Sequence, residues 1–177
     1  MTTRRFKKLV NLYQDRIFTF AHYYLGHREE AEDATQEVLI RLWRNRSEID
    51  PARIEPWLIT VTRNACFDAL RKRKNYRSRV TSADFDDPAL GHLLKHEETP
   101  QSHTESAEFQ HRLEQAISKI REPYRSILIL REIQDQKYDR ISEVLDLPLN
   151  TVKGYLHRGR KMLREQLKPW VKNGTPE

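Results

Sequence analysis

Residues 138–163, which read YDRISEVLDLPLNTVKGYLHRGRKML, contain the pattern that decides the fold of the second half of the chain. Ile141, Val144 and Leu145 have the spacing of the buried face of a short helix, and Val152 and Leu156 that of a following helix. Between these two sets, the sequence Asp-Leu-Pro predicts a tight turn. The stretch therefore predicts a helix-turn-helix, a motif that lays its second helix in the major groove of DNA.

The second helix of this motif carries a basic face. Lys153, His157, Arg160 and Arg164 recur at intervals of four, three and four residues, which places them on one side of the helix, and Arg158 widens that side. Basic residues of this kind bind phosphates, and residues near the start of such a helix can reach base edges. The alternative is a solvated basic surface with no ligand. We predict that this face binds duplex DNA.

The composition favours helices and a polyanionic partner. Charged residues make up 33% of the 177 residues, the chain has only five Gly, and its formal net charge is +6. A single cysteine excludes an intramolecular disulfide framework and a zinc site made of several cysteines. No apolar run approaches the roughly 20 residues that a membrane helix needs, so we expect a cytoplasmic protein without membrane insertion.

Apolar residues three and four positions apart predict an all-α fold of two small helical domains joined by a flexible linker. In the first half we predict helices over about residues 6–25, 29–46 and 57–74, with a loop at 47–56 that contains Pro51 and Pro56. In the second half we predict helices over about residues 109–120, 123–133, 138–145 and 150–167. The resulting domains are residues 1–76 and 107–172, and residues 77–106 form an acidic, Pro- and Ser-containing linker.

The predicted third helix also has a basic face, and its composition is unusual. Thr60, Arg63, Asn64, Phe67 and Arg71 share one side, so that cations, an amide, a hydroxyl and an aromatic ring stand together. Flat rings and polar groups beside phosphate-binding cations suit unpaired bases. Taken alone, such a helix is more often simply a basic surface. A second basic face on the same chain favours nucleic-acid contact at both.

These residues, in this order, resemble the extracytoplasmic-function (ECF) sigma factors of RNA polymerase. In the first half the resemblance rests on the acidic run 29–33, on Gln36-Glu37-Val38, on Arg41-Leu42-Trp43, on Trp57-Leu58 and on Arg63-Asn64-Ala65. In the second half it rests on Leu128-Ile129-Leu130-Arg131, on Thr151-Val152-Lys153 and on Leu156-His157-Arg158-Gly159-Arg160. Each piece is weak alone, but the ordered set is specific to this family.

The resemblance implies an alternative sigma factor without catalytic activity or cofactor, which binds core RNA polymerase and directs transcription initiation at specific promoters. It implies polymerase-binding residues Glu32, Asp33, Gln36, Glu37 and Arg41. It implies −10 DNA-binding residues Asp50, Arg53, Ile54, Trp57, Thr60, Arg63, Asn64, Phe67 and Arg71. It implies −35 DNA-binding residues Thr151, Lys153, Gly154, His157, Arg158, Arg160 and Arg164. Its partners are then core RNA polymerase, promoter DNA and a regulatory protein such as an anti-sigma factor.

Three other functions compete with this prediction. A transcription regulator that uses only the terminal helix-turn-helix would need a sensory first half, whereas the predicted first half is a small helical unit with a basic face of its own. A structural RNA-binding protein lacks support, because no aromatic sheet motif or Gly-rich loop of the common RNA modules is found in the sequence. An enzyme or metal site is disfavoured, because His22 and His27 have no ligand spacing relative to the acidic run.

Overall fold

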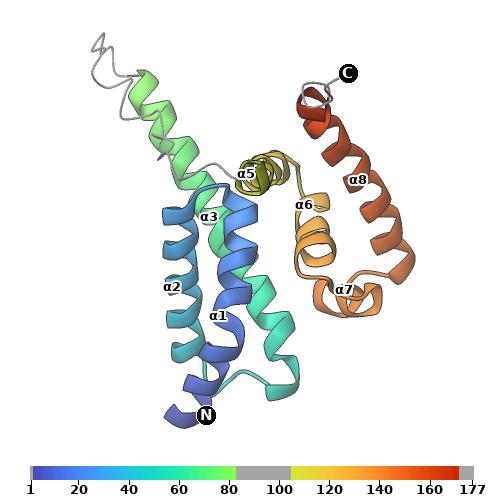
Figure 1. Cartoon of the computed structure of the whole chain (residues 1–177). Helices are drawn as coiled ribbons and strands as arrows, with labels where there is room; N and C mark the ends of the chain where they lie inside the picture. Colours follow the sequence, from blue (N-terminus) through green and yellow to red (C-terminus); the bar gives the residue numbers. More distant parts are fainter. Residues whose placement is uncertain (1, 83–104, 172–177) are drawn as a thin grey trace.

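The computed structural model describes residues 2–82 and 105–171, and its regular elements over these residues are helices, which confirms the predicted all-α class (Figure 1). In the first half they are α1 (Thr3–Leu25), α2 (Arg28–Arg44), the 3₁₀ turn η1 (Pro51–Arg53) and α3 (Ile54–Ser82). In the second half they are α5 (Glu105–Ser118), α6 (Tyr124–Leu128), the π-helical segment η2 (Ile129–Ile133), α7 (Tyr138–Leu145) and α8 (Leu149–Val171). Residues 83–104, most of the predicted linker, lie outside the described residues.

Helices α1, α2 and α3 form a three-helix bundle, as Figure 1 shows. Phe20 and Tyr24 of α1 are fully buried and meet Val38 of α2 and Leu58 of α3 in its core. Helix α1 ends at Gly26, whose left-handed φ of 70° is costly for residues with a Cβ, and whose N–H donates to the His22 carbonyl at 2.8 Å. The early glycine stop thus turns the chain back into α2.

The second half is built around α6 and η2. Residues 127–130 are four consecutive apolar residues with at most 1% of their surface exposed, so this helical segment is surrounded on all sides. Helix α8 packs on α6 through Val152 and Leu156, and the Tyr155 ring meets the Tyr124 ring edge to face with centroids 5.4 Å apart. The buried segment formed by α6 and η2 is therefore the core against which α7 and α8 pack.

Helices α7 and α8 form the predicted helix-turn-helix. Asp146 ends α7 in the left-handed region, at φ 52°, a conformation that Asp tolerates better than most residues. The Leu147 N–H then donates to the Ser142 carbonyl at 3.0 Å, and the Ser142 hydroxyl donates to the Leu147 carbonyl at 2.5 Å. These two bonds lock the turn on which the direction of α8 depends.

Several helix ends differ from the prediction. Helix α3 begins at Ile54 and continues to Ser82, so residues 77–82 are helical rather than part of a linker, since no Gly or Pro interrupts this stretch. Pro56 lies in the first turn of α3, where its missing N–H costs no helical bond. Helix α8 begins at Leu149 and runs through Pro169, which interrupts only its final turn.

The two halves are in contact along α1 and α3. Three side chains of the second half bind backbone carbonyls of the first: Gln115 bonds Gly26 at 3.0 Å, Arg125 bonds Tyr24 at 3.2 Å and Gln134 bonds Arg16 at 2.8 Å. The His22 imidazole and the Glu114 carboxylate add a fourth polar contact at 3.0 Å. The described halves therefore form one closed arrangement.

The two glycines of α8 differ in their surroundings, and this difference predicts opposite stability effects. A Cβ at Gly154 would meet nothing within 4 Å, whereas a Cβ at Gly159 would lie 3.1 Å from Cγ of the fully buried Leu128. Gly154→Ala is expected to raise the free energy of unfolding by about 0.5–1 kcal/mol through helix propensity. Gly159→Ala is expected to lower it by about 1–2 kcal/mol, because overpacking against Leu128 outweighs that gain. Urea unfolding followed by circular dichroism checks both, and stabilisation by Gly159→Ala would contradict the packing argument.

Candidate nucleic-acid and polymerase interfaces

The basic face predicted on α8 lies on the surface of the second half. Lys153, Gly154, His157, Arg158, Arg160 and Arg164 are exposed, and Thr151 is half-buried at the start of the helix. Their opposite neighbours Val152 and Leu156 are in the core, so the apolar and basic residues separate onto two sides as predicted. This face can approach a duplex without any rearrangement of α7 or α8.

The residues of this face differ in the partners that they already have. Arg160 is paired with Glu132 of η2 at 2.8 Å, and the hydrogen bond to Glu132 raises the pKa of Arg160. Within the described residues, Arg158 makes no hydrogen bond or ion pair. If this face binds DNA, Arg160 has to give up a carboxylate to bind a phosphate, whereas Arg158 can bind a base edge without losing a contact.

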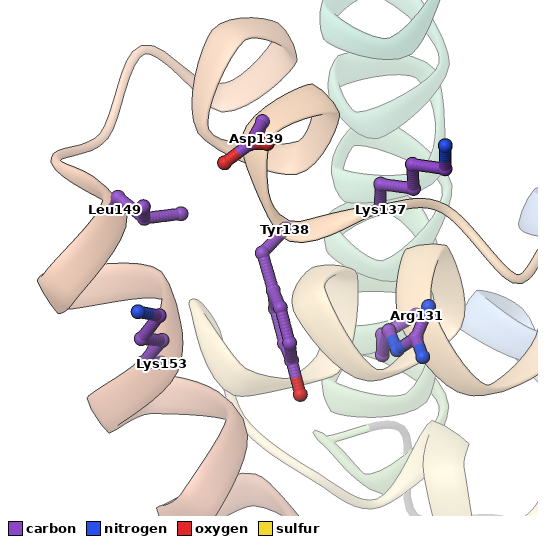
Figure 2. Close-up of a pocket in the computed structure, with 6 residues that line it drawn as sticks. All are labelled: Arg131, Lys137, Tyr138, Asp139, Leu149 and Lys153. Carbon is purple, nitrogen blue, oxygen red and sulfur yellow. The ribbon is translucent and has the colours of Figure 1, made fainter.

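A cavity of about 290 Å³ opens beside this face, between α8, η2 and the start of α7. Figure 2 shows Tyr138 between Lys153 of α8 and Arg131 of η2, and Lys137 precedes the ring. The Arg131 guanidinium lies 5.2 Å from the centroid of the Tyr138 ring and donates to the Gln136 carbonyl at 2.9 Å. Lys153 and Arg131 are suited to a phosphate of the DNA backbone, but Asp139 also lines this cavity, and Arg131 already pairs with Asp135 at 3.2 Å.

This geometry gives Lys153 a testable role. Lys153→Ala is expected to weaken duplex binding about equally on all sequences, and to reduce the slope of log K against log salt by about 0.9 for the one lost phosphate contact. Fluorescence anisotropy across a salt series checks it, with Lys119→Ala, at an exposed lysine directly after α5, as the matched control. A change in base preference with an unchanged salt slope would instead make Lys153 a base-reading residue.

The second predicted nucleic-acid face lies on α3. Thr60, Asn64, Phe67 and Arg71 are exposed, and Phe67 has 60% of its surface accessible although it is a large aromatic residue. An exposed aromatic ring between polar groups can stack on an unpaired base. Arg63 is half-buried, because Glu122 of the second half lies 3.5 Å from its Nη2 atom.

The loop predicted at residues 47–56, here called the −10 loop, is shorter than expected, because η1 and the start of α3 occupy its second part. The Asp50 carboxylate accepts a bond from the Ala52 N–H at 2.9 Å, which starts η1, and η1 leads directly into α3. Asp50 and Arg53 are exposed and Trp57 is half-buried. Ile54, predicted to contact DNA, has 9% of its surface exposed and belongs to the core of the bundle, so its side chain is not available to a base.

A larger cavity, of about 510 Å³, lies between this loop and α7. Asp50, Arg53, Trp57 and Thr60 line it from the first half, among other residues of the loop. From the second half it is lined by Glu143, Val144 and Asp146 at the end of α7. Sequence patterns gave no reason to place these acids beside the loop, because the contact is between halves and not within one helix.

The acidic residues predicted to bind polymerase lie along α2. Glu32, Asp33 and Gln36 are exposed, and Glu37 and Arg41 are half-buried. Arg41 binds Glu37 at 2.7 Å, and this hydrogen bond is the main reason for the lowered pKa of Glu37, while Arg28 binds Glu32 at 2.9 Å. Asp33 has no such partner among the described residues, so its carboxylate is the most available to a basic protein surface.

Among the described residues, no helix is long and apolar enough to cross a membrane. No group of three or more His, Cys, Asp and Glu side chains within the same residues is arranged to hold a metal ion.

Comparisons with known proteins identify the family of the chain. Residues 9–76 match Sigma-70 region 2, and residues 110–163 match Sigma-70, region 4. The chain is 31% identical over 166 residues to the ECF RNA polymerase sigma factor SigW of Bacillus subtilis, covering 92% of this chain and 89% of that protein. It is 28% identical over 172 residues to the RNA polymerase sigma-H factor of Pseudomonas aeruginosa, covering 96% and 89%. Its fold is similar to that of the sigma factor RpoE of Bartonella quintana, solved in complex with the anti-sigma factor NepR, with a TM-score of 0.68, 19% identity and coverage of 94% and 98%.

Proposed function

This chain belongs to the family of ECF RNA polymerase sigma factors, and we propose that its two halves divide promoter recognition between them. As an alternative sigma factor it binds core RNA polymerase and directs transcription initiation at specific promoters. In the proposed division, the bundle of α1–α3 binds polymerase and the opened −10 element, and the half formed by α5–α8 binds the −35 element as duplex. The residues between the halves act as a linker.

The observation that carries this proposal is the presence of two exposed faces of different chemistry on the two halves. The α8 face is a set of basic residues on the second helix of the helix-turn-helix, and it suits the phosphates and base edges of a duplex. The α3 face combines cations with Asn64 and the exposed ring of Phe67, which suits unpaired bases. The two faces together therefore suit a protein that contacts a promoter both as duplex and as an opened strand.

The acidic surface of α2 is proposed to bind polymerase, and this contact explains why the two DNA-binding faces belong to one protein. Asp33, Gln36 and the neighbouring acids project from the same bundle that carries the α3 face. A basic segment of polymerase bound there would hold the α3 face at a fixed position on the enzyme. The chemistry of RNA synthesis then belongs to polymerase, and we assign no catalytic residue to this chain. The site of action is accordingly the cytoplasm.

A regulatory partner is also part of the proposal. The Bartonella quintana relative was solved in complex with an anti-sigma factor. We propose that a protein of this class binds the present chain and competes with polymerase. Copurification from the native cells, followed by mass spectrometry, would identify it.

Reconstitution with core RNA polymerase tests the proposed function. The purified full chain is expected to form a stoichiometric complex with core enzyme and to start transcripts at a subset of promoters on which core enzyme alone is inactive. Size-exclusion chromatography and run-off transcription on genomic fragments measure these two results. Duplex binding without any complex with core enzyme, under conditions where another sigma factor forms one, would favour a regulator that uses only the helix-turn-helix.

A further inference from the structure

A group of cations lies at one end of the three-helix bundle, outside the α3 face, the α8 face and the acidic surface of α2. We call this group the basic pole, and it consists of Arg4, Arg5, Lys7 and Lys8 in the first turns of α1, with Arg44 and Arg46 at and just after the end of α2. The start of α1, the end of α2 and the start of α3 lie at this same end of the bundle (Figure 1). The rings of Phe6 and Trp43 meet edge to face with centroids 4.8 Å apart, which joins the two parts of the pole.

Most cations of the basic pole have no anionic partner in the chain. The exposed side chains that make no hydrogen bond or ion pair among the described residues are those of Arg4, Arg5, Lys7, Lys8 and Arg44. Residues 1–14 contain no acid, and the last acid of α2, Glu37, is bound by Arg41 at 2.7 Å. Asp50, beyond the end of α2, accepts the bond that starts η1. The positive charge of the pole is therefore not neutralised within the molecule.

The cations of α1 are also not explained by the stability of the helix. The first turn of a helix favours carboxylates and disfavours cations, because the helix dipole is positive there. Helix α1 has no acid in its first turn. Its contacts with the core are made by Phe6, Leu9 and Tyr13, and not by the basic residues. Cations that oppose the dipole and support no contact within the chain indicate an anionic ligand outside it.

The nearest proposed binding surface is the −10 loop. Arg46 directly precedes this loop, and its guanidinium lies 4.0 Å from the centroid of the Trp43 ring and donates to the Trp43 carbonyl at 2.8 Å. Trp43 has 37% of its surface exposed, so the stacked pair faces solvent beside the loop. Along the chain, the loop thus has the basic pole on one side and the α3 face on the other.

We propose that the basic pole binds the phosphates of the single DNA strand where that strand leaves the −10 loop. This inference rests on the proposed role of the α3 face. Lysine and arginine bind phosphates without reading bases, so the pole holds a strand of any sequence and keeps it on the bundle after the −10 bases are bound. An anionic membrane offers similar charges, but the position of the pole beside the loop favours the strand.

Strand length and salt dependence together test this contact. The probes are fluorescein-labelled single strands that carry the −10 element of a promoter found by run-off transcription. One strand ends at the element, and two others are extended by about ten nucleotides on the 5′ or on the 3′ side. Anisotropy with the complex of full chain and core polymerase gives the affinity for each probe over a salt series.

The pole variant combines Arg4→Gln with Lys8→Gln, which lie four residues apart on one side of α1. For one of the two extended strands, the slope of log K against log salt is expected to fall by about 1.4, because two single-strand phosphate contacts are lost. Between 50 and 200 mM salt this corresponds to about a sevenfold smaller loss of affinity than in the parent chain. The slope for the short strand is expected to stay unchanged.

A second pair of substitutions controls for the change in net charge. Lys119→Gln combined with Lys168→Gln removes the same charge at exposed positions of the second half, and its slopes are expected to match those of the parent chain. The melting temperature of the pole variant is expected to equal or exceed that of the parent, because the removed charges oppose the helix dipole. If the variant fails to fold, Arg44→Gln tests the pole from α2, with a slope change of about 0.7.

Four results would overturn the inference. Unchanged slopes for both extended strands would mean that the pole does not touch the strand, and an equal change for the short strand would indicate only a general effect of charge. Weaker binding of the pole variant to core polymerase would assign the pole to an acidic protein surface. Lost cosedimentation with vesicles of phosphatidylglycerol and phosphatidylcholine, at unchanged strand binding, would assign it to a membrane. Failure of the proposed function is seen separately, because the parent complex would then start no transcripts.

Discussion

Charge reversal at Asp33 and Glu37 is expected to lower the affinity for core RNA polymerase by at least about tenfold each, and to leave duplex binding by the second half unchanged. Both residues project from α2, on the bundle formed by the first half, whereas the α8 face belongs to the other half. Lysine at either position would repel a basic polymerase segment. Asp33→Lys is expected to have the larger effect, because Glu37 is already paired with Arg41.

Fluorescence titration of labelled chain with core enzyme gives the affinity, and anisotropy with a duplex gives DNA binding. Asp15→Lys is the control, since it makes the same charge change at an exposed position of α1. Thermal unfolding of each variant checks that α2 remains folded. Equal losses of polymerase and DNA binding would contradict the assignment, because one local contact cannot account for both.

Arg158→Ala is expected to reduce discrimination between the preferred −35 sequence and a mismatched one by about 1–3 kcal/mol. Arg158 is exposed on the α8 face and makes no hydrogen bond or ion pair within the described residues, so its guanidinium can bind two acceptors of a guanine without breaking another contact. Removing it leaves those acceptors unbound in the preferred site only.

The measurement needs a selected −35 sequence, obtained by enrichment from a randomised duplex, and a set of single-base variants of it. Parent chain and Arg158→Ala are titrated against each duplex at one salt concentration. Arg160→Ala is the informative comparison, because Arg160 is paired with Glu132 and is assigned to a phosphate. A loss of affinity that is uniform across the set would place Arg158 on a phosphate as well.

Local features of the fold follow from the sequence because each depends on neighbours along the chain. The apolar spacing predicts a helix over 138–145 with the bounds that α7 has, and Gly26 predicts the end of α1. The basic face of α8 is likewise a matter of spacing by three and four residues. For such features the helical period alone determines which side chains share a side.

The prediction fails where the partner is distant in the chain. Glu55 is bound by residues 39 and 85 positions away, and no periodicity marks such contacts. Ile54 shows the same limit, since its place within the predicted loop at 47–56 implied contact with DNA, and only the packing of α3 on the bundle puts it in the core. The sequence shows which residues are basic and which of them share a helix face. It does not show which acidic residues from distant parts of the chain pair with them.

The cavity beside Tyr138 could not be predicted from the sequence, for a different reason. Arg131 lies on η2 and Lys137 on the connection to α7, outside the helix whose spacing predicts a basic face. That spacing therefore identifies only Lys153 among the residues that line the cavity. Arg131 was part of the family resemblance but carried no role. The signal that could have found it is Lys137 directly before Tyr138 at the start of the first helix of the motif, with Arg131 in the preceding helix.

Gly26 has a consequence for how this protein can be recombined with its relatives. A Cβ there would lie 2.9 Å from the Ser118 hydroxyl of the second half, and the Gly26 carbonyl accepts the bond from Gln115. The bend between two helices of one half is thus shaped to fit a helix of the other. In a chimera that joins the carboxy-terminal half of a relative to this amino-terminal half, the contacts of Gly26 with residues 115 and 118 are expected to be disturbed, even when each half folds. The halves are coadapted parts of one molecule and not freely exchangeable modules.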